Sequence, residues 1–404
     1  MGGSCRYGDA RRVRELLAVL ASSAVGSRNA LILRMKVSTC RCALPLYMEP
    51  IRHKACLNPL CKDIGKLDAG NIILHASFDT KSGTRQRCLC KTCGGTFSAN
   101  TGTAYVGLRC SRDEFDQVAT MRVEGNSISA IARMTGRSRS TIDRWLERAA
   151  VSAKRFNDER LRDFEITELQ ADELCTFVGS KASTRWLFTA IEVSSRVWPT
   201  KVLGRRSYRN TELLFNETVH RGKIVGQVLV TSDGFEFYEK VVRKVFGVAA
   251  IYGQVIKTRR NNRVIRVQRE LKIGTRRQLA AALLESEDSE KLNTSYVERL
   301  NLTLRQSSAY LARRSPAHAR CDRRLDEHVE LVQCHYNFIR PHMALKFGKV
   351  CRTPAMQAGL TRRRLSFRDV FGTGVSSRPR TVVIRFPERR SSAGTSPLEA
   401  QLAA

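Results

Sequence analysis

The strongest constraint on the fold lies between residues 165 and 345. In this region short apolar runs rich in β-branched residues alternate with segments of helical periodicity. The runs of strand length fall near residues 166–179, 185–193, 197–204 and 227–232. Strands that alternate with helices along a chain favour an α/β arrangement. We therefore predict a mixed sheet with flanking helices.

The charge balance of the chain indicates a polyanionic partner. The 404 residues include 70 Lys and Arg against 38 Asp and Glu, a formal net charge of +32. Each phosphate contact neutralises a cation and also releases condensed counterions, so nucleic acid is the expected partner. A ribosome-associated or merely basic protein would show the same balance.

The two ends of the chain differ from its middle. Residues 1–50 show no clear hydrophobic periodicity, and the first segment with the pattern of a folded domain begins at Met48. We therefore interpret residues 1–50 as a poorly defined extension. Residues 361–404 are Arg-rich and then poor in core-forming residues, which predicts a basic, flexible tail. No run reaches the roughly 18 apolar residues of a membrane span, and we expect a cytoplasmic protein.

Five of the 13 cysteines lie between Cys56 and Cys93, within a region that we delimit as residues 51–105. Two close pairs about 28 residues apart suit a tetrahedral zinc site, because each turn presents two thiolates to the metal. The predicted ligands of one structural zinc in a zinc ribbon are Cys56, Cys61, Cys90 and Cys93. Cys88 is a spare candidate, and ordinary buried cysteines are the alternative.

Residues 111–160 have the pattern of a helix-turn-helix. Ser111 or Asp113 can cap a first helix and Ser127 a second, while a third begins at Ser138 or Ser140. The front of the third helix enters the major groove in such domains. The residues expected to contact DNA there are Arg137, Arg139, Ser140, Thr141 and Arg144. A three-helix scaffold without DNA contacts is the alternative.

Three carboxylates occupy positions from which they could bind metal ions together. Asp172 lies within an apolar run, and Asp233 ends another beside Gly234. Glu298 lies on a segment with a helical apolar stripe and can therefore face the first two acids across the sheet. Mg2+ prefers carboxylate oxygens, and two such ions can serve phosphodiester displacement. A chance triple among 38 acids is the alternative, and Glu173 competes with Asp172 for the first position.

The chain resembles the DDE transposases of bacterial insertion sequences, nearest to the insertion-sequence-one type. The segments TSDG and YVERLNLTLRQ are similar to the second and third acidic motifs of that family. The third motif includes Glu298, Arg299 and Asn301, with Arg305 seven positions after the glutamate. The first-acid block is matched by Asp172, Phe177, Gly179, Lys181 and Trp186. The likeness covers about residues 52–345.

The resemblance implies an RNase H-like, retroviral-integrase-like catalytic domain over residues 165–345 that cuts the element's ends and transfers the strand to target DNA. It implies two Mg2+ or Mn2+ ions on Asp172, Asp233 and Glu298, with Asn301 and Arg305 positioning a phosphate. The implied partners are the terminal repeats and the target duplex, bound by a homo-oligomer. The implied setting is bacterial and associated with the nucleoid.

One departure from the family pattern is the 65-residue separation of the second and third acids, which contains a basic insert. Residues 251–280 carry nine Lys and Arg and one Glu. We predict a β-ribbon or helix that follows the DNA backbone, with contacts from Arg259, Arg260 and Arg263. A solvated charged face would have the same composition.

Two other functions fit the same features. A non-catalytic DNA-binding regulator could retain the zinc ribbon and the helix-turn-helix beside a decayed catalytic domain. A metal-dependent nuclease could use the same acids without any element as partner. Loss of an acid would favour the regulator, and all three acids are present.

Overall fold

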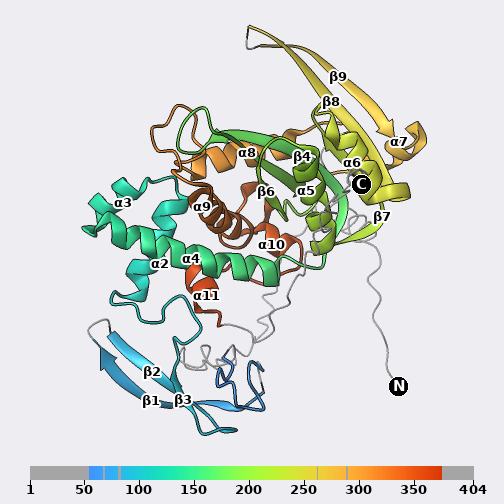
Figure 1. Ribbon diagram of the computed structural model, residues 1–404. Coiled ribbons are helices and arrows are strands. Elements are labelled where there is room, and N and C mark those ends of the chain that lie inside the picture. Colours follow the sequence, from blue (N-terminus) through green and yellow to red (C-terminus); the bar gives the residue numbers. More distant parts are fainter. Residues whose placement is uncertain (1–53, 67–68, 81–82, 262, 288–289, 375–404) are drawn as a thin grey trace, which may run out of the picture. The chain divides into compact units, whose positions relative to one another are not determined.

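The computed structural model describes residues 54–66, 69–80, 83–261, 263–287 and 290–374 (Figure 1). By internal contacts the chain divides into Met1–Tyr47 and Met48–Ala404, and every described residue belongs to the second unit. The expected extension over residues 1–50 therefore lies outside the described residues. None of the helices in the described ranges combines the length and apolar character needed to cross a membrane.

The cysteine-rich region forms a small antiparallel sheet. Its strands are β1 (Ile72–Thr80), β2 (Gly83–Cys90) and β3 (Thr96–Ser98), in the order β1-β2-β3. The register places Ile72 opposite Cys90 and Cys88 opposite Phe97. The core beneath this sheet is small and consists largely of cysteine side chains. Such a core buries little apolar area, so the domain needs a further source of stability.

Three helices follow: α2 (Arg112–Val123), α3 (Ile128–Thr135) and α4 (Arg139–Arg160). Ser111, Ser127 and Ser138 cap them by accepting backbone N–H bonds, which decides between the alternative caps. Gly136, with a φ of 68°, ends α3 in the left-handed conformation that glycine adopts without strain.

The first helices pack around Val118, Ile131 and Ile142. Met134 follows Ile128 and Ile131 at helical spacing, but it is 53% exposed. Ala132 completes the buried face of α3 in its place, because the contact with α4 lies on the side of Ile128 and Ile131.

A six-stranded mixed sheet forms the centre of the larger domain, as the alternating pattern predicted. Its strands in chain order are β4 (Phe164–Phe177), β5 (Thr184–Glu192), β6 (Lys201–Gly204), β7 (Gly222–Ser232), β8 (Ala250–Arg260) and β9 (Arg263–Ile273). Their order across the sheet is β6-β5-β4-β7-β8-β9. Strands β4, β7 and β8 are parallel, and the other neighbours pair antiparallel.

Helices cover both faces of this sheet (Figure 1). Helices α5 (Tyr208–Arg221) and α6 (Phe237–Phe246) pack on one face around Phe215 and Tyr238. Helices α8 (Ser295–Ser307) and α9 (Asp322–Cys334), together with α4, pack around Leu174 and Leu187 on the other face. The short segment η1 (Gly247–Ala249) joins α6 to β8.

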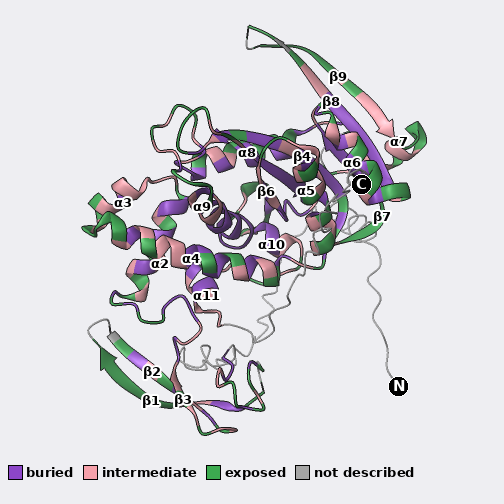
Figure 2. Cartoon of the chain, viewed as in Figure 1, coloured by how far each residue is buried: buried purple, intermediate pink, exposed green. Residues whose placement is uncertain are grey.

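The basic insert is a hairpin that also belongs to the central sheet. We assigned residues 251–280 entirely to a DNA-tracking segment, whereas Ile251, Tyr252 and Val255 are buried in the core. Parallel pairing with β7 requires apolar side chains on both faces of this first half. The half of the hairpin farther from the sheet is exposed (Figure 2), and helix α7 (Arg276–Glu285) follows it.

The chain after α9 packs back on the core. It contains η2 (His335–Ile339), η3 (Met343–Leu345), β10 (Lys346–Phe347), β11 (Val350–Cys351), α10 (Pro354–Gln357) and α11 (Phe367–Gly372). The predicted flexible tail over 361–404 is therefore wrong for α11, because Phe367, Val370 and Phe371 are buried there. Residues 375–404 lie outside the described part of the chain.

Candidate active site, cysteine cluster and DNA-binding surfaces

Two acids meet where the parallel pairing of β4 and β7 ends. Strands β4 and β7 are parallel, and their register pairs Ala171 with Ser232. Asp172 follows Ala171, and Asp233 follows Ser232. The backbone therefore places the two carboxylates side by side. The ligand oxygens of Asp172, Asp233 and Glu173 all lie within 4.8 Å of one another. The negative charge of Asp233 at this distance disfavours ionisation of Asp172 and of Glu173, and a bound cation would relieve this repulsion.

The carboxylate of Asp172 is held in place by two bonds. Asn301 of α8 donates Nδ2 to Oδ2 at 2.8 Å, and the Glu173 amide donates to Oδ1 at 2.8 Å. Asn301 Oδ1 in turn accepts from Thr189 at 3.2 Å. Burial and the neighbouring Asp233 raise the pKa of Asp172 to about 6. Asp172 therefore faces α8, the helix that also bears Glu298.

Glu173 lies on the opposite face of β4, because successive strand residues alternate between faces. It is buried against α6, and its Oε2 accepts from Arg206 Nη2 at 3.1 Å. Burial and Asp233 raise the pKa of Glu173 to about 7, while the nearby Tyr238 and the charge of Arg206 act against this rise. Arg206 also approaches Asp233, with Nη2 and Oδ2 3.7 Å apart. Glu173 is thus close to Asp172 and Asp233, but its side chain is buried on the α6 side of the sheet.

Glu298 lies in the first turn of α8, outside the close group of acids. Its Oε1 accepts from Thr294 Oγ1 at 2.7 Å and forms an ion pair with Lys257 of β8. Its charge contributes to the raised pKa of Asp172, so the two carboxylates interact. The side chain is 48% exposed.

The two residues expected to position a phosphate already have partners within the protein. Asn301 is buried and bonded to Asp172 and Thr189, so its contact is with the acid. Arg305 is half-buried and donates Nη1 to the Leu311 carbonyl at 3.0 Å. A guanidinium has five N–H donors, so four remain on Arg305 after this bond.

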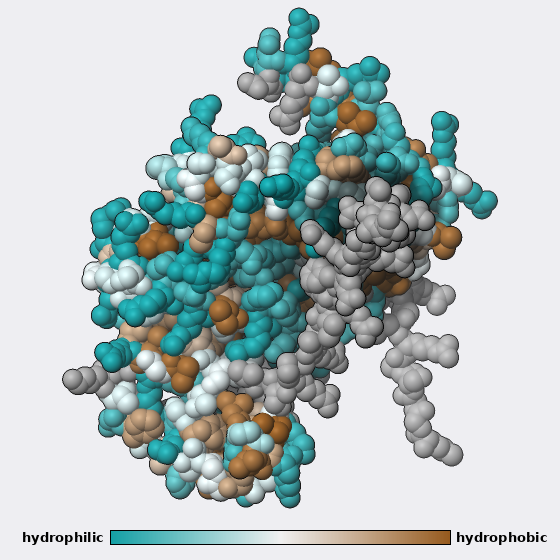
Figure 3. Space-filling view, in the orientation of Figure 1, coloured by the Kyte–Doolittle hydropathy of each residue, from teal (hydrophilic) through white to brown (hydrophobic). Residues whose placement is uncertain are grey.

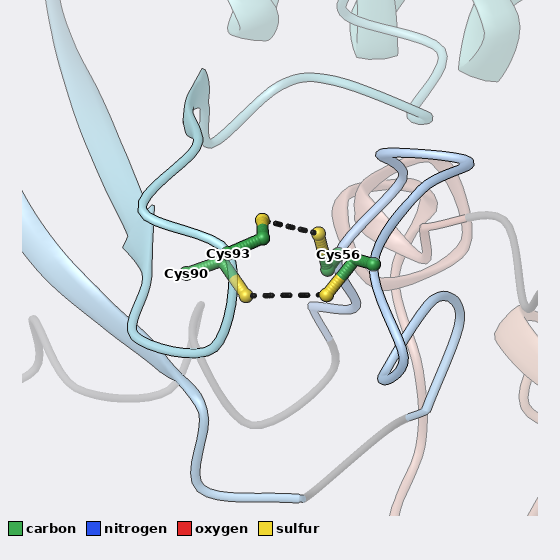
Figure 4. Close-up of side chains that lie close together, drawn as sticks. Cys56, Cys90 and Cys93 are labelled. Carbon is green, nitrogen blue, oxygen red and sulfur yellow. Dashed lines mark hydrogen bonds between the residues drawn. The ribbon is translucent and has the colours of Figure 1, made fainter.

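The four predicted zinc ligands come together (Figure 4). The sulfur atoms of Cys56 and Cys93 are 3.7 Å apart, and those of Cys61 and Cys90 are 3.9 Å apart. A tetrahedron of sulfur atoms about 2.3 Å from a zinc ion has edges of about 3.8 Å, so the geometry fits. The Gly95 amide lowers the pKa of Cys93 to about 7, which favours the thiolate. Cys88, the spare candidate, is buried outside the group.

At the N-terminal end of α4, some of the residues predicted to contact DNA are exposed, and others are bonded within the protein. Arg139, Ser140 and Arg144 are exposed, although Ser140 bonds Ser138 and Arg144 bonds the Ser140 carbonyl. Thr141 also bonds the cap residue Ser138 at 2.9 Å. Arg137 instead pairs with Glu114 at 2.6 Å and 3.0 Å, which ties α4 to α2.

The far half of the hairpin β8–β9 carries the predicted backbone contacts. Arg260 and Arg263 face each other at its end and are both exposed. The side chain of Arg259 is outside what the structure describes. Figure 3 shows a mainly hydrophilic surface over this hairpin, with scattered hydrophobic patches. Ile265 of β9 is a hydrophobic residue that is 61% exposed.

Two family models match the chain. A helix-turn-helix domain model matches residues 111–149, and the IS1 transposase model matches residues 166–284. The second match contains both Asp172 and Asp233 at the meeting point of β4 and β7. The chain is an insertion-sequence transposase, nearest to the IS1 type. A transposase cuts and joins DNA, so its general activity is that of a nuclease and transferase, and DNA is its partner.

The transposase is also similar to a solved structure. The cryo-electron microscopy structure of the piggyBac transposase synaptic complex with hairpin DNA matches with a TM-score of 0.30 and 8% identity. The match covers 67% of this chain and 73% of that chain. No curated protein matches the transposase. Glu298 and the cysteine cluster lie outside both family-model matches.

Sequence reasoning missed the two cations that contact the acids of the transposase. Arg206 lies 33 residues after Glu173, in the loop between β6 and α5, and Lys257 lies 41 residues before Glu298. Lys257 belongs to the basic insert, but nothing in its spacing indicated a carboxylate partner. Only the pairing of β8 beside β7 brings it to the acids.

Proposed function

We propose that this transposase cleaves DNA at the ends of its insertion sequence and joins the freed 3′ end to target DNA. Asp172, Asp233 and Glu298 are the proposed ligands of two divalent ions, Mg2+ or Mn2+. The observation that carries the proposal is the register of β4 and β7, which sets Asp172 beside Asp233. Bound ions would activate the attacking oxygen and stabilise the leaving one.

The sheet topology supports an RNase H-like catalytic domain over residues 165–345. On one side of its first strand, β4, lie β5 and then β6, each antiparallel to the strand beside it. On its other side lie two parallel strands, β7 and β8. This is the strand arrangement of RNase H-like domains, and β9 extends it by one strand.

The face of the sheet on which each side chain lies supports Asp172 over Glu173 as the proposed first ligand. Asp172 points toward α8, where Glu298 is one helical turn before Asn301. Glu173 points toward α6 and is neutralised by Arg206. A metal pair between the sheet and α8 would therefore be held by Asp172, Asp233 and Glu298, whereas Glu173, although its oxygens lie close to both aspartates, is buried on the α6 side.

The remaining residues of the site act on the ligands and the substrate. Asn301 fixes the orientation of Asp172, because its amide bonds one carboxylate oxygen. Arg305 is close enough to Asp172 for their charges to interact and keeps donors for a phosphate. Arg305 is therefore the proposed phosphate-positioning residue of this pair.

The cysteine cluster is the proposed site of one structural zinc ion in a zinc ribbon over residues 51–105. The support is the sulfur spacing, close to that of a zinc tetrahedron, and the small core around it. Zinc bound by Cys56, Cys61, Cys90 and Cys93 would supply the stability that this core lacks.

The proposed division of labour on DNA follows the positions of the basic residues. The helix-turn-helix over residues 111–160 would recognise the terminal repeats through Arg139, Ser140, Thr141 and Arg144, with Arg137 bracing the reading helix against Glu114. Arg259, Arg260 and Arg263 on the hairpin would follow the backbone. Two ends must be joined in one complex, so we also propose a homo-oligomer on DNA, in bacterial cytoplasm at the nucleoid.

The test is cleavage of an end-bearing duplex by the Asp172→Asn, Asp233→Asn and Glu298→Gln variants. Each should lose cleavage in Mg2+ and keep specific binding to the element's end, because an amide keeps the shape of the side chain but not its charge. Cleavage at a near wild-type rate by any of the three would remove that residue from the ligand set.

A further inference from the structure

An open pocket of about 610 Å³ lies next to the acids and has no part in the proposed function so far. It is formed between the β4–β5 turn and the loop from β6 to α5, and three arginines, a tryptophan and hydroxyl side chains line it. Its volume falls in the range of about 300–1,000 Å³ that is usual for pockets that enclose small ligands.

Arg206 connects this pocket with the acids. Its guanidinium lines the pocket and also donates to Glu173 at 3.1 Å. The same guanidinium stacks on Phe235, with its carbon 3.9 Å from the ring centroid, and lies 5.0 Å from the centroid of Trp186. A ligand in contact with Trp186 and Arg206 would therefore lie one side chain away from the acids.

The three arginines of the pocket are not equivalent. Arg185 is held by two bonds to Asp322, of 2.7 Å and 3.0 Å. Arg206 is committed to Glu173 and Asp233. Arg205 is exposed, and among the described residues only its backbone carbonyl has a hydrogen-bond partner, Asn210. Arg205 is thus the cation available to an incoming anion, and Ser183 and Thr184 add hydroxyl donors on the same rim.

We propose that this pocket binds one unpaired nucleotide of the DNA strand that the acids act on. The base stacks on Trp186 beside Arg206, and its phosphate contacts Arg205. The inference deepens the proposed function, because it rests on Asp172 and Asp233 being the reacting centre. It names the local state of the DNA there, which is a strand opened at the end of the element.

The chemistry of the pocket favours an unpaired base over an intact duplex. A paired base exposes only its edge in a groove, and hydrogen-bond donors and acceptors read that edge. An aromatic ring offers its face, which a base can use only after it leaves the stack. Trp186 is half-exposed, and the guanidinium of Arg206 lies close to its ring. Aromatic rings together with arginines bind single strands without sequence preference.

The experiment compares two end-bearing duplexes, one blunt and one with a three-nucleotide single-stranded dT overhang at the cleaved terminus. Binding is measured in Ca2+ for the full-length protein and for its Trp186→Leu, Trp186→Phe, Arg205→Gln and Arg205→Lys variants. We expect wild type to bind the overhang about tenfold more tightly, the scale of one base stacked on an aromatic ring. Trp186→Phe and Arg205→Lys should keep most of this advantage, whereas Trp186→Leu and Arg205→Gln should lose it.

Blunt-duplex affinity and a thermal melt serve as controls for folding, because Trp186 also packs against the core beneath α5 and α6. Replacing the overhang thymines with 5-iodouracil should yield a light-induced crosslink that maps to Trp186. Equal affinity of wild type for the two duplexes, or an undiminished advantage in Trp186→Leu, would overturn the proposal. If the wild-type protein does not cleave at the element's end but still binds the overhang duplex more tightly than the blunt one, the result would count against the catalytic proposal alone.

Discussion

Lys257 of β8 forms an ion pair with Glu298 of α8. The pair joins the basic hairpin to the proposed third ligand, so the hairpin has a direct contact with the site as well as a charged surface. Both side chains are partly exposed, at 28% and 48%, which limits the strength of the pair and leaves Glu298 open to a competing cation.

The Lys257→Met variant should bind divalent ions more tightly than wild type, because the ammonium and the metal compete for one carboxylate. An exposed ion pair contributes about 0.2–1 kcal/mol, so we expect up to about a fivefold fall in the Mg2+ concentration for half-maximal cleavage. Mn2+ binding without DNA, followed by electron paramagnetic resonance, should shift in the same direction.

The matched control is Lys272→Met. Lys272 lies on the same hairpin and pairs with Glu270 at 2.6 Å, so it removes the same charge without touching Glu298. An equal shift in both variants would mean that the hairpin acts through its overall charge and not through the Glu298 contact.

The cysteine cluster gives a second prediction. Purified protein should contain about one zinc per chain, and Cys90→Ser should release it and lower the stability of residues 54–105, because the small core depends on the ion. The control is Cys88→Ser, since Cys88 is equally buried but lies outside the cluster. Full zinc content in Cys90→Ser would remove it from the ligand set.

The two basic surfaces should fail in different ways when altered. Arg139→Ala with Arg144→Ala should weaken binding to the element's end more than to random duplex, because base contacts discriminate by about 1–3 kcal/mol each. Arg260→Ala with Arg263→Ala should weaken both equally and reduce the salt slope by about 0.9 per lost phosphate contact. Affinities for both DNAs at several salt concentrations separate these outcomes, and a uniform loss in the first variant would reduce α4 to a general clamp.

Buried histidines make stability depend on pH. Burial and the charges of Arg340 and Arg364 lower the pKa of His335 from 6.5 to about 4. The unfolded chain therefore binds more protons between pH 6.5 and 4, so stability is present above this window and falls as pH decreases through it. From pH 7 to 5 His335 alone should cost roughly 2 kcal/mol of unfolding free energy. Urea unfolding of His335→Phe should show a weaker pH dependence than wild type.

Local chemistry made much of the fold predictable. Ser127 and Gly136 delimit α3 because a hydroxyl cap and a left-handed glycine act within a few residues of the helix ends. The buried strand before Asp233 was recognisable from its apolar run, and the parallel arrangement then brings it beside β4. The cysteine group followed in the same way, because its spacing matches the reach of two turns around one ion.

Long-range contacts were beyond the reach of the sequence patterns. Arg206 and Lys257 reach the acids only through the pairing of strands, which residue spacing does not reveal. Helix α11 was taken for a tail because six residues among arginines give too short a period to read. Its burial depends on the cavity that α2 and α4 provide for Phe371, with Phe115 5.3 Å away between ring centroids.

The choice between Asp172 and Glu173 is the prediction on which the site depends most. Both acids belong to the close group, but they lie on opposite faces of β4, with Asn301 on one side and Arg206 on the other. Asp172→Asn should reduce cleavage by at least about a thousandfold, because one missing ligand disables the whole unit. Glu173→Gln should cleave within a few-fold of wild type, because it keeps the bond to Arg206 and never meets the ions. Strand cleavage and end binding measured on the same preparations decide this: an equal loss in Glu173→Gln would place the metal pair on the α6 face and displace Glu298 from the ligand set.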